Sequence, residues 1–168
     1  MVGRIIETDA CVAEGAAWLA RACPRLGHAL QQTGPLPLRR RPDGFAELLS
    51  AIISQQVSTA SASAIWARMQ AAGLTDPDRI LAASEDGLRA PGLSRQKARY
   101  ASALARARID YATLRRAPDA EVIETLTAVP GIGPWTAEIY AMFSLGRADI
   151  FAPGDLARYQ EGQRLTQV

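Results

Sequence analysis

The sequence holds few cysteines and no long apolar run. Its two cysteines, Cys11 and Cys23, are too few to supply the four thiolates of an iron–sulfur cluster. We expect both to be small buried residues on a helical stretch, and we predict no metal site. No apolar stretch reaches the roughly 18 residues of a membrane helix, and residues 1–9 lack the apolar run of a secretory signal. These absences predict a protein of the reducing cytoplasm without a membrane partner.

Lysine is nearly absent as well, because the chain has 18 arginines and one lysine, Lys97. The net charge of +2 indicates no particular partner, but the distribution of charge is uneven. Residues 89–116 carry eight basic side chains and one acid, Asp110, a net charge of +7. Such a cluster is typical of a surface that binds a phosphate backbone. A solvated helix face in an arginine-rich protein is the alternative.

At 168 residues the chain is long enough for one domain, and its apolar residues recur at helical spacing. The pattern predicts helices over residues 12–22, 26–32, 45–72, 94–108, 119–129 and 134–145, with short helices beginning at Asp76-Pro77 and Ser84. Polar residues 54–59 interrupt the longest of these runs. No stretch alternates long enough to form a convincing strand. The predicted fold class is all-α.

The most informative segment is residues 129–137, Val-Pro-Gly-Ile-Gly-Pro-Trp-Thr-Ala, between two predicted helices. Gly131 and Gly133 permit a tight turn and close approach of a ligand, and Ile132 can point into the core. The backbone N–H groups of Gly133 and of the first helical turn, which includes Thr136, then face outward at the positive end of a helix dipole. This arrangement predicts a site for a DNA phosphate. A plain helical corner is the alternative.

A second segment, residues 91–98, repeats this frame. Residues 91–94 and 130–133 both read Pro-Gly-apolar-small, and each frame ends in an alanine, Ala98 or Ala137. We therefore expect two similar hairpins. Ser94, Arg95 and Lys97 would face phosphates if the second hairpin resembles the first.

The chain resembles the helix-hairpin-helix (HhH-GPD) DNA glycosylases, in particular the 3-methyladenine DNA glycosylase II branch. The resemblance rests on the pattern LxxVPGIGPWTA at residues 126–137, followed by Pro153-Gly154-Asp155. Residues 53–58 and 92–98 support it. It implies the helix-hairpin-helix glycosylase fold and a monofunctional hydrolase of base-excision repair. That hydrolase would cleave the N-glycosidic bond of alkylated purines such as 3-methyladenine in double-stranded DNA.

The resemblance also implies roles for single residues. Asp155 stands at the position of the family's catalytic aspartate, although an N-cap role is the alternative. Trp135 stands where relatives that also cut the backbone carry a nucleophilic lysine, so the chain should use water. An aromatic ring there also suits a cationic alkylated base; a buried core tryptophan is the alternative. Tyr140 is a further candidate for the pocket wall.

Gln55 matches the position from which some relatives insert a glutamine into the duplex, and a structural hydrogen-bond network is the alternative. Family hairpin turns can also hold a monovalent cation, and no other cofactor is expected. We expect a monomer associated with the nucleoid.

The sequence departs from the family after Asp155. Family members continue with further helices, whereas residues 157–168 show no helical stripe. We therefore expect a helical glycosylase domain at residues 1–156, with the hairpin at about residues 119–145. The fold would be incomplete at the C-terminus and end in a non-family or disordered tail at 157–168. The alternatives to an enzyme are a non-catalytic helix-hairpin-helix DNA-binding protein and an inactive truncated glycosylase.

Overall fold

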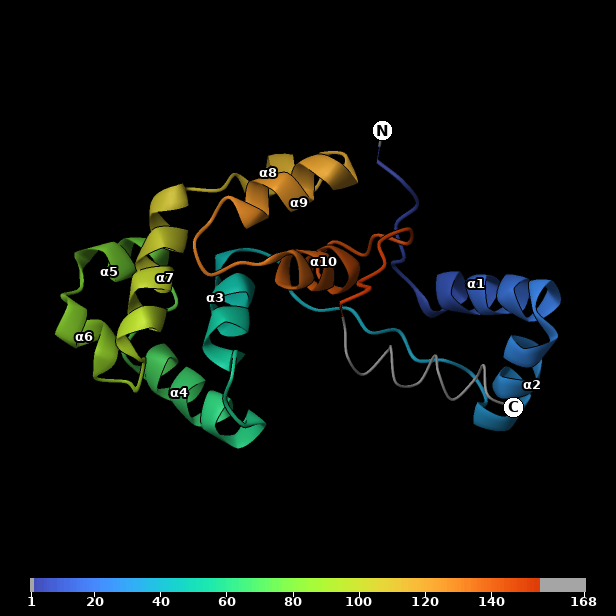
Figure 1. Cartoon of the computed structure of the whole chain (residues 1–168), viewed down its shortest axis with the longest axis horizontal. Helices are drawn as coiled ribbons and strands as arrows, with labels where there is room; N and C mark the ends of the chain where they lie inside the picture. The colour runs from blue at the N-terminus through green and yellow to red at the C-terminus, as the bar shows by residue number, and fades with distance from the viewer. Residues whose placement is uncertain (1, 155–168) are drawn as a thin grey trace.

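A computed structural model describes residues 2–154 of the chain, and every regular element in this range is a helix. The elements are α1 (Asp9–Ala22), α2 (Pro24–Thr33), α3 (Phe45–Ser54), α4 (Thr59–Ala71), α5 (Pro77–Ala82), α6 (Glu85–Arg89), α7 (Arg95–Ala107), α8 (Tyr111–Leu114), α9 (Asp119–Thr127) and α10 (Pro134–Phe143). Figure 1 shows α1 and α2 at one end of the molecule, α4 to α6 at the other, and α10 between them. The all-α prediction is confirmed for the described residues.

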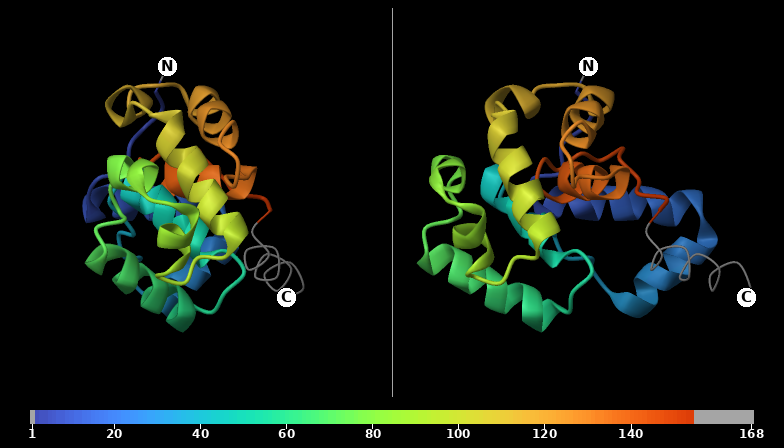
Figure 2. Two further views of the ribbon diagram at one scale, coloured as in Figure 1. Left: turned by 90° about the vertical axis from the view of Figure 1, so that its left-hand side faces the viewer. Right: turned by 60° about the vertical axis from the view of Figure 1, so that its left-hand side comes forward.

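Helix α7 is the centre of the larger lobe, where it packs against α3, α5 and α6 (Figure 2). Its inward face is formed by Ala98, Ala101, Leu104 and Ala105, all buried, as the apolar spacing predicts. Alanines at three of these positions let the neighbouring helices approach closely. Helix α3 contributes the fully buried Leu48, Leu49 and Ile52 to the same core. The lobe therefore has one continuous apolar centre beneath both hairpins.

The single helix predicted over residues 45–72 is wrong, because the structure breaks it into α3 and α4. The break lies at residues 55–58, where Gln56 adopts a left-handed conformation with φ +57°. Ser58 then caps α4, and its Oγ accepts a hydrogen bond from the Ser61 backbone N–H at 3.2 Å. Apolar periodicity continues across the break because both helices bury their faces in one core.

The short helices begin at capping residues. Asp76 caps α5 and Ser84 caps α6, as predicted from the sequence. Helix α8 was not predicted, although Asp110 marks its start by accepting hydrogen bonds from the backbone N–H groups of Ala112 and Thr113. With four residues, α8 is too short to show an apolar period.

The smaller lobe is the α1–α2 hairpin, whose two helices pack against each other and bury no residue completely. Trp18 and Leu36 are exposed on this hairpin and the segment that follows it. Cys11 and Cys23 are free and half-buried, so the expectation of buried cysteines is only partly met.

The N-terminal segment joins the loop after α10, where Ile5 and Arg147 form an isolated antiparallel bridge. The domain boundary predicted at residue 156 lies outside the described residues. Within residues 2–154, no helix has both the length and the apolar character needed to cross a membrane.

Candidate nucleic-acid interface

The first hairpin joins α9 to α10 through the turn at residues 128–133. Gly131 has φ +96°, and a Cβ at this position would lie 2.4 Å from Tyr100 Cγ, so only glycine fits here. Ile132 is buried and its N–H donates to Val129 O at 3.0 Å. Gly133 is exposed and caps α10, and a Cβ there would meet no atom within 4 Å.

This geometry leaves the N-terminus of α10 open on its outer side. The first N–H groups of a helix have no acceptor within the helix, and the helix dipole places partial positive charge there. No side chain of the described residues caps α10, and Pro134 contributes no N–H. Thr136 is buried, so its side chain contributes little to this surface. The arrangement is suited to an anion bound by main chain.

The second hairpin, residues 91–98, has the local geometry of the first. Gly92 has φ +112°, Leu93 is buried as Ile132 is, and the Ala98 N–H donates to Ser94 O as the Ala137 N–H donates to Gly133 O. The repeated sequence frame therefore corresponds to a repeated turn.

The two hairpins differ in what occupies the helix start. Ser94 Oγ accepts from the Lys97 N–H at 3.2 Å and so caps α7. Arg95 pairs with Glu85 at 3.2 Å, and the ammonium of Lys97 points to α3. The side chains predicted to face phosphates here thus have partners within the protein, and the first hairpin is the more open of the two.

The turn between α3 and α4 lies against the first hairpin. Gln55 Nε2 donates to Gly131 O at 3.0 Å, so the hydrogen-bond network weighed for this residue is present. Its neighbour Gln56 is exposed at the tip of the turn in a left-handed conformation. Sequence reasoning missed Gln56. The polar residues 54–59, which interrupt the helix predicted over residues 45–72, were the available signal.

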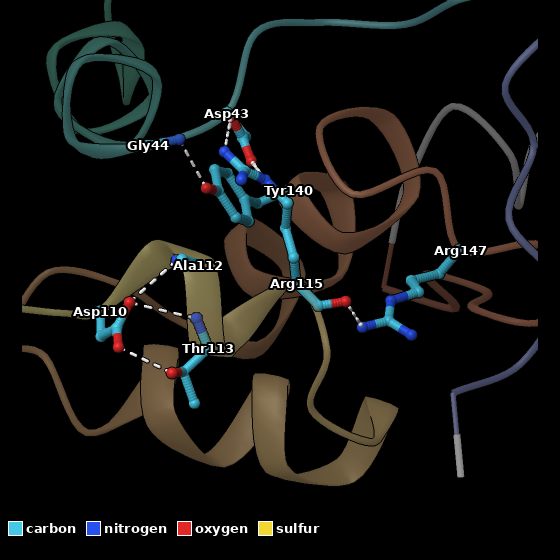
Figure 3. A network of polar contacts seen from close by, with 8 residues as sticks. All are labelled: Asp43, Gly44, Asp110, Ala112, Thr113, Arg115, Tyr140 and Arg147. Carbon is cyan, nitrogen blue, oxygen red and sulfur yellow. Dashed lines mark hydrogen bonds and ion pairs between the residues drawn. The ribbon is translucent and has the colours of Figure 1, made fainter.

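Two aromatic residues of α10 lie on different faces of the helix. Trp135 is 46% exposed at the start of α10, so it is not the buried core tryptophan of the alternative interpretation. Tyr140 is buried, and its hydroxyl accepts a hydrogen bond from the Gly44 N–H at 2.7 Å (Figure 3). Five positions along a helix correspond to a rotation of about 140°. Tyr140 and Trp135 therefore do not share a face of α10, and the role of Tyr140 as pocket wall stays a prediction. Burial raises the pKa of the Tyr140 phenol to about 12.

Polar contacts connect α10 and the loop that follows it to the segment before α3 and to the end of α8 (Figure 3). Asp43, in the segment before α3, pairs with Arg115 after α8, and this hydrogen bond lowers the pKa of the Asp43 carboxyl. Arg147 is buried and its Nη2 donates to the carbonyl oxygens of Arg115 and Ala117 at 3.0 and 2.8 Å. The network joins segments that are distant in the sequence and holds α10 in place.

The basic segment at residues 89–116 is partly neutralised within the protein. Four of its arginines pair with carboxylates, namely Arg89 with Asp86, Arg95 with Glu85, Arg108 with Asp78 and Arg115 with Asp43. Arg99, Arg106 and Arg116 are exposed and take part in no ion pair among the described residues. The charge available to a phosphate backbone is therefore smaller than the sequence count indicates.

Comparison with known proteins connects this geometry to a family. Residues 49–168 match the model of the HhH-GPD superfamily of base excision DNA repair proteins. The chain belongs to this superfamily.

Two relatives illustrate the match in sequence. The DNA-3-methyladenine glycosylase 1 of Schizosaccharomyces pombe is 31% identical over 126 residues, which cover 70% of this chain and 55% of that protein. The DNA-3-methyladenine glycosylase 2 of Escherichia coli is 34% identical over 127 residues, covering 67% and 45%. The chain thus spans about half the length of these curated relatives.

Solved structures share the fold. A DNA-3-methyladenine glycosidase from Bacillus halodurans superimposes with a TM-score of 0.79 at 36% identity, over 88% of this chain and 71% of that one. A 3-methyladenine DNA glycosylase from Schizosaccharomyces pombe in complex with abasic DNA gives a TM-score of 0.75 at 26% identity, over 92% and 81%. The helix-hairpin-helix glycosylase fold predicted from the sequence is confirmed for the described part of the chain.

Proposed function

We propose that this protein is a monofunctional DNA glycosylase of base-excision repair. It hydrolyses the N-glycosidic bond of alkylated purines in double-stranded DNA. The observation that carries the proposal is the open hairpin, whose first helical turn begins α10 with the exposed Trp135 beside it. A DNA phosphate on the hairpin would hold the duplex while the ring of Trp135 contacts a flipped base. A ring face attracts the positive charge of an alkylated purine by roughly 0.5–2 kcal/mol.

In this mechanism the sugar passes through an oxocarbenium-like state as the base leaves. Asp155 supplies the carboxylate that stabilises this positive charge and orients or deprotonates water. This role comes from the family resemblance, because Asp155 lies outside the described residues and Gly154 is the last residue before it.

The environment of Lys97 supports a water mechanism. A glycosylase that also cuts the backbone needs a free amine to form a Schiff base with the sugar. The only lysine of this chain is Lys97, and its Nζ lies 2.6 Å from Ile53 O and 2.7 Å from Gln55 O. An amine held in this way is not available as a nucleophile, and Trp135 occupies the hairpin position at which the lysine would be expected.

The turn at residues 55–58 would face the duplex in this proposal. Gln56 is better placed than Gln55 to enter the DNA, because its side chain is exposed while the Gln55 amide is bound to Gly131 O.

A monovalent cation at the hairpin would share the carbonyl oxygen of Gly131, which has a second lone pair. The protein would act as a monomer on the DNA of the nucleoid, in the cytoplasm.

The test is the release of free base from methylated duplex DNA by the full chain and by Asp155→Asn. We expect the wild-type chain to release 3-methyladenine, and Asp155→Asn to lose release by at least about 100-fold because the general base is gone. Binding to abasic duplex should persist in the variant. Excision that survives the substitution would refute the role of Asp155. Binding without excision by the wild-type chain would instead favour a non-catalytic DNA-binding protein.

A further inference from the structure

The side chain of Lys97 points into the protein rather than to solvent. It starts from α7, is half-buried, and its ammonium donates to Ile53 O at 2.6 Å and to Gln55 O at 2.7 Å. These carbonyls lie at the C-terminal end of α3, where a helix has no further N–H groups to offer and its dipole is negative. Lys97 therefore caps α3 from another helix.

Lysine suits a position where the acceptors are two backbone carbonyl oxygens. An ammonium is compact and has three donors, whereas the planar guanidinium of arginine is larger and shaped for carboxylate and phosphate groups. None of the ion pairs within residues 2–154 includes Lys97. Burial lowers the pKa of its ammonium. In a chain with 18 arginines, this is the one basic position filled by lysine.

The residues that Lys97 holds are themselves bound to the first hairpin. Gln55, whose carbonyl accepts from Lys97, donates through its side chain to Gly131 O at 3.0 Å. Helix α7 reaches the same hairpin through Tyr100, one turn after Lys97, because the Tyr100 ring lies against Gly131 so closely that no Cβ would fit. The helix thus contacts both the 55–58 turn and the hairpin.

We propose that Lys97 is a positioning residue, which sets the placement of the 55–58 turn relative to the first hairpin. The inference rests on the proposed function, in which both surfaces contact the damaged duplex. Lys97 acts through the backbone of α3 and through Gln55, without contacting DNA. This role replaces the phosphate contact that the repeated hairpin frame predicted for Lys97.

The wild-type chain can be tested directly, because its single lysine gives one side-chain signal after labelling with lysine carrying ¹³C at Cε. We expect the pKa of Lys97 to lie below the ordinary 10.5 in the free protein and not to rise when abasic duplex is added. A rise on binding DNA would overturn the proposal, since an anionic partner stabilises the ammonium. Rapid exchange of the Lys97 ammonium protons with water in the free protein would also overturn it, because the proposed role requires the ammonium to stay bonded to Ile53 O and Gln55 O. If the chain binds no DNA at all, the proposed function fails, while the measurements on the free protein still test these two bonds.

Two variants separate positioning from a phosphate contact. Lys97→Met and Lys97→Arg should both lower base release about tenfold, because neither restores the two bonds to carbonyl oxygens. Both should keep the wild-type dependence of DNA affinity on salt. A phosphate contact predicts instead that Lys97→Met reduces the slope of log K against log salt by about 0.9 and that Lys97→Arg retains activity; that result would overturn the proposal. Arg99→Met, on the same helix, is the matched control for the loss of one positive charge.

Discussion

At the scale of single residues, the two hairpin glycines have different tasks although they are two positions apart. Gly131 is required for the fold, because its φ of +96° and the adjacent Tyr100 ring exclude any side chain. Gly133 has an ordinary φ of −88° and open space around it. Its small size therefore matters only to something that approaches the hairpin from outside. The sequence motif combines a folding requirement and a binding requirement.

We expect Gly131→Ala to lower the free energy of unfolding by about 2–4 kcal/mol, as the sum of backbone strain and overpacking. Gly133→Ala should change it by less than about 1 kcal/mol while weakening binding to abasic duplex, because the added methyl group stands before the open N–H groups. Urea denaturation and fluorescence titration measure the two effects. Equal losses of stability in both variants would contradict this division of roles.

At the scale of elements, the break between α3 and α4 decides how the polar run at residues 54–59 is used. A continuous helix would spread these side chains around its axis. The break collects them in one turn that lies against the hairpin, with Gln55 bound and Gln56 exposed. The left-handed Gln56 has a conformational cost that L-residues rarely accept. Ser58 as the cap of α4 and Lys97 as the cap of α3 offset it.

Ser58→Ala should lower the free energy of unfolding by about 1 kcal/mol, since it removes the acceptor for the Ser61 N–H at the start of α4. Ser63→Ala is the matched control, because Ser63 is exposed in the interior of the same helix and alanine is the better helix former there. Thermal or urea unfolding followed by circular dichroism measures both. Identical behaviour of the two variants would show that the cap contributes nothing.

At the scale of the whole molecule, a few polar contacts hold the segment before α3 to the end of α8 and to α10. Asp43 pairs with Arg115, and the next residue, Gly44, donates to the buried Tyr140 hydroxyl (Figure 3). These contacts join residues that are 72 and 96 positions apart. The chain therefore depends on polar tertiary contacts, as well as on the apolar core, to position α10.

The ion pair between Asp43 and Arg115 should make the free energy of unfolding sensitive to acid. The pKa of Asp43 is lowered in the folded protein by its bond to Arg115, so its contribution is present above the ordinary aspartate pKa of about 4 and is lost as pH falls through the lowered value. Asp43→Asn should remove roughly 1 kcal/mol at neutral pH and flatten this part of the profile. Urea denaturation between pH 7 and pH 3 measures the effect. Asp86→Asn, at a strongly exposed position, should follow the wild-type profile.

The sequence by itself determined the fold class, most helix positions and the hairpin, because these depend on local chemistry. Apolar spacing, capping residues such as Asp76 and Ser84, and the glycine-rich turn act within a few residues of one another. Local patterns also suggested the repeat at residues 91–98, whose turn geometry the structure reproduces.

Only the tertiary structure decided what each polar side chain meets. Apolar periodicity did not show the break at residues 55–58, because both helices bury the same kind of face in one core. Charge counting did not show that Lys97 and four arginines of the basic segment have partners within the protein. The partners of Lys97, Gln55 and Tyr140 are 42 to 96 positions away in the sequence. Such contacts exist only after the helices have packed, and they determine which residues remain free to meet a ligand.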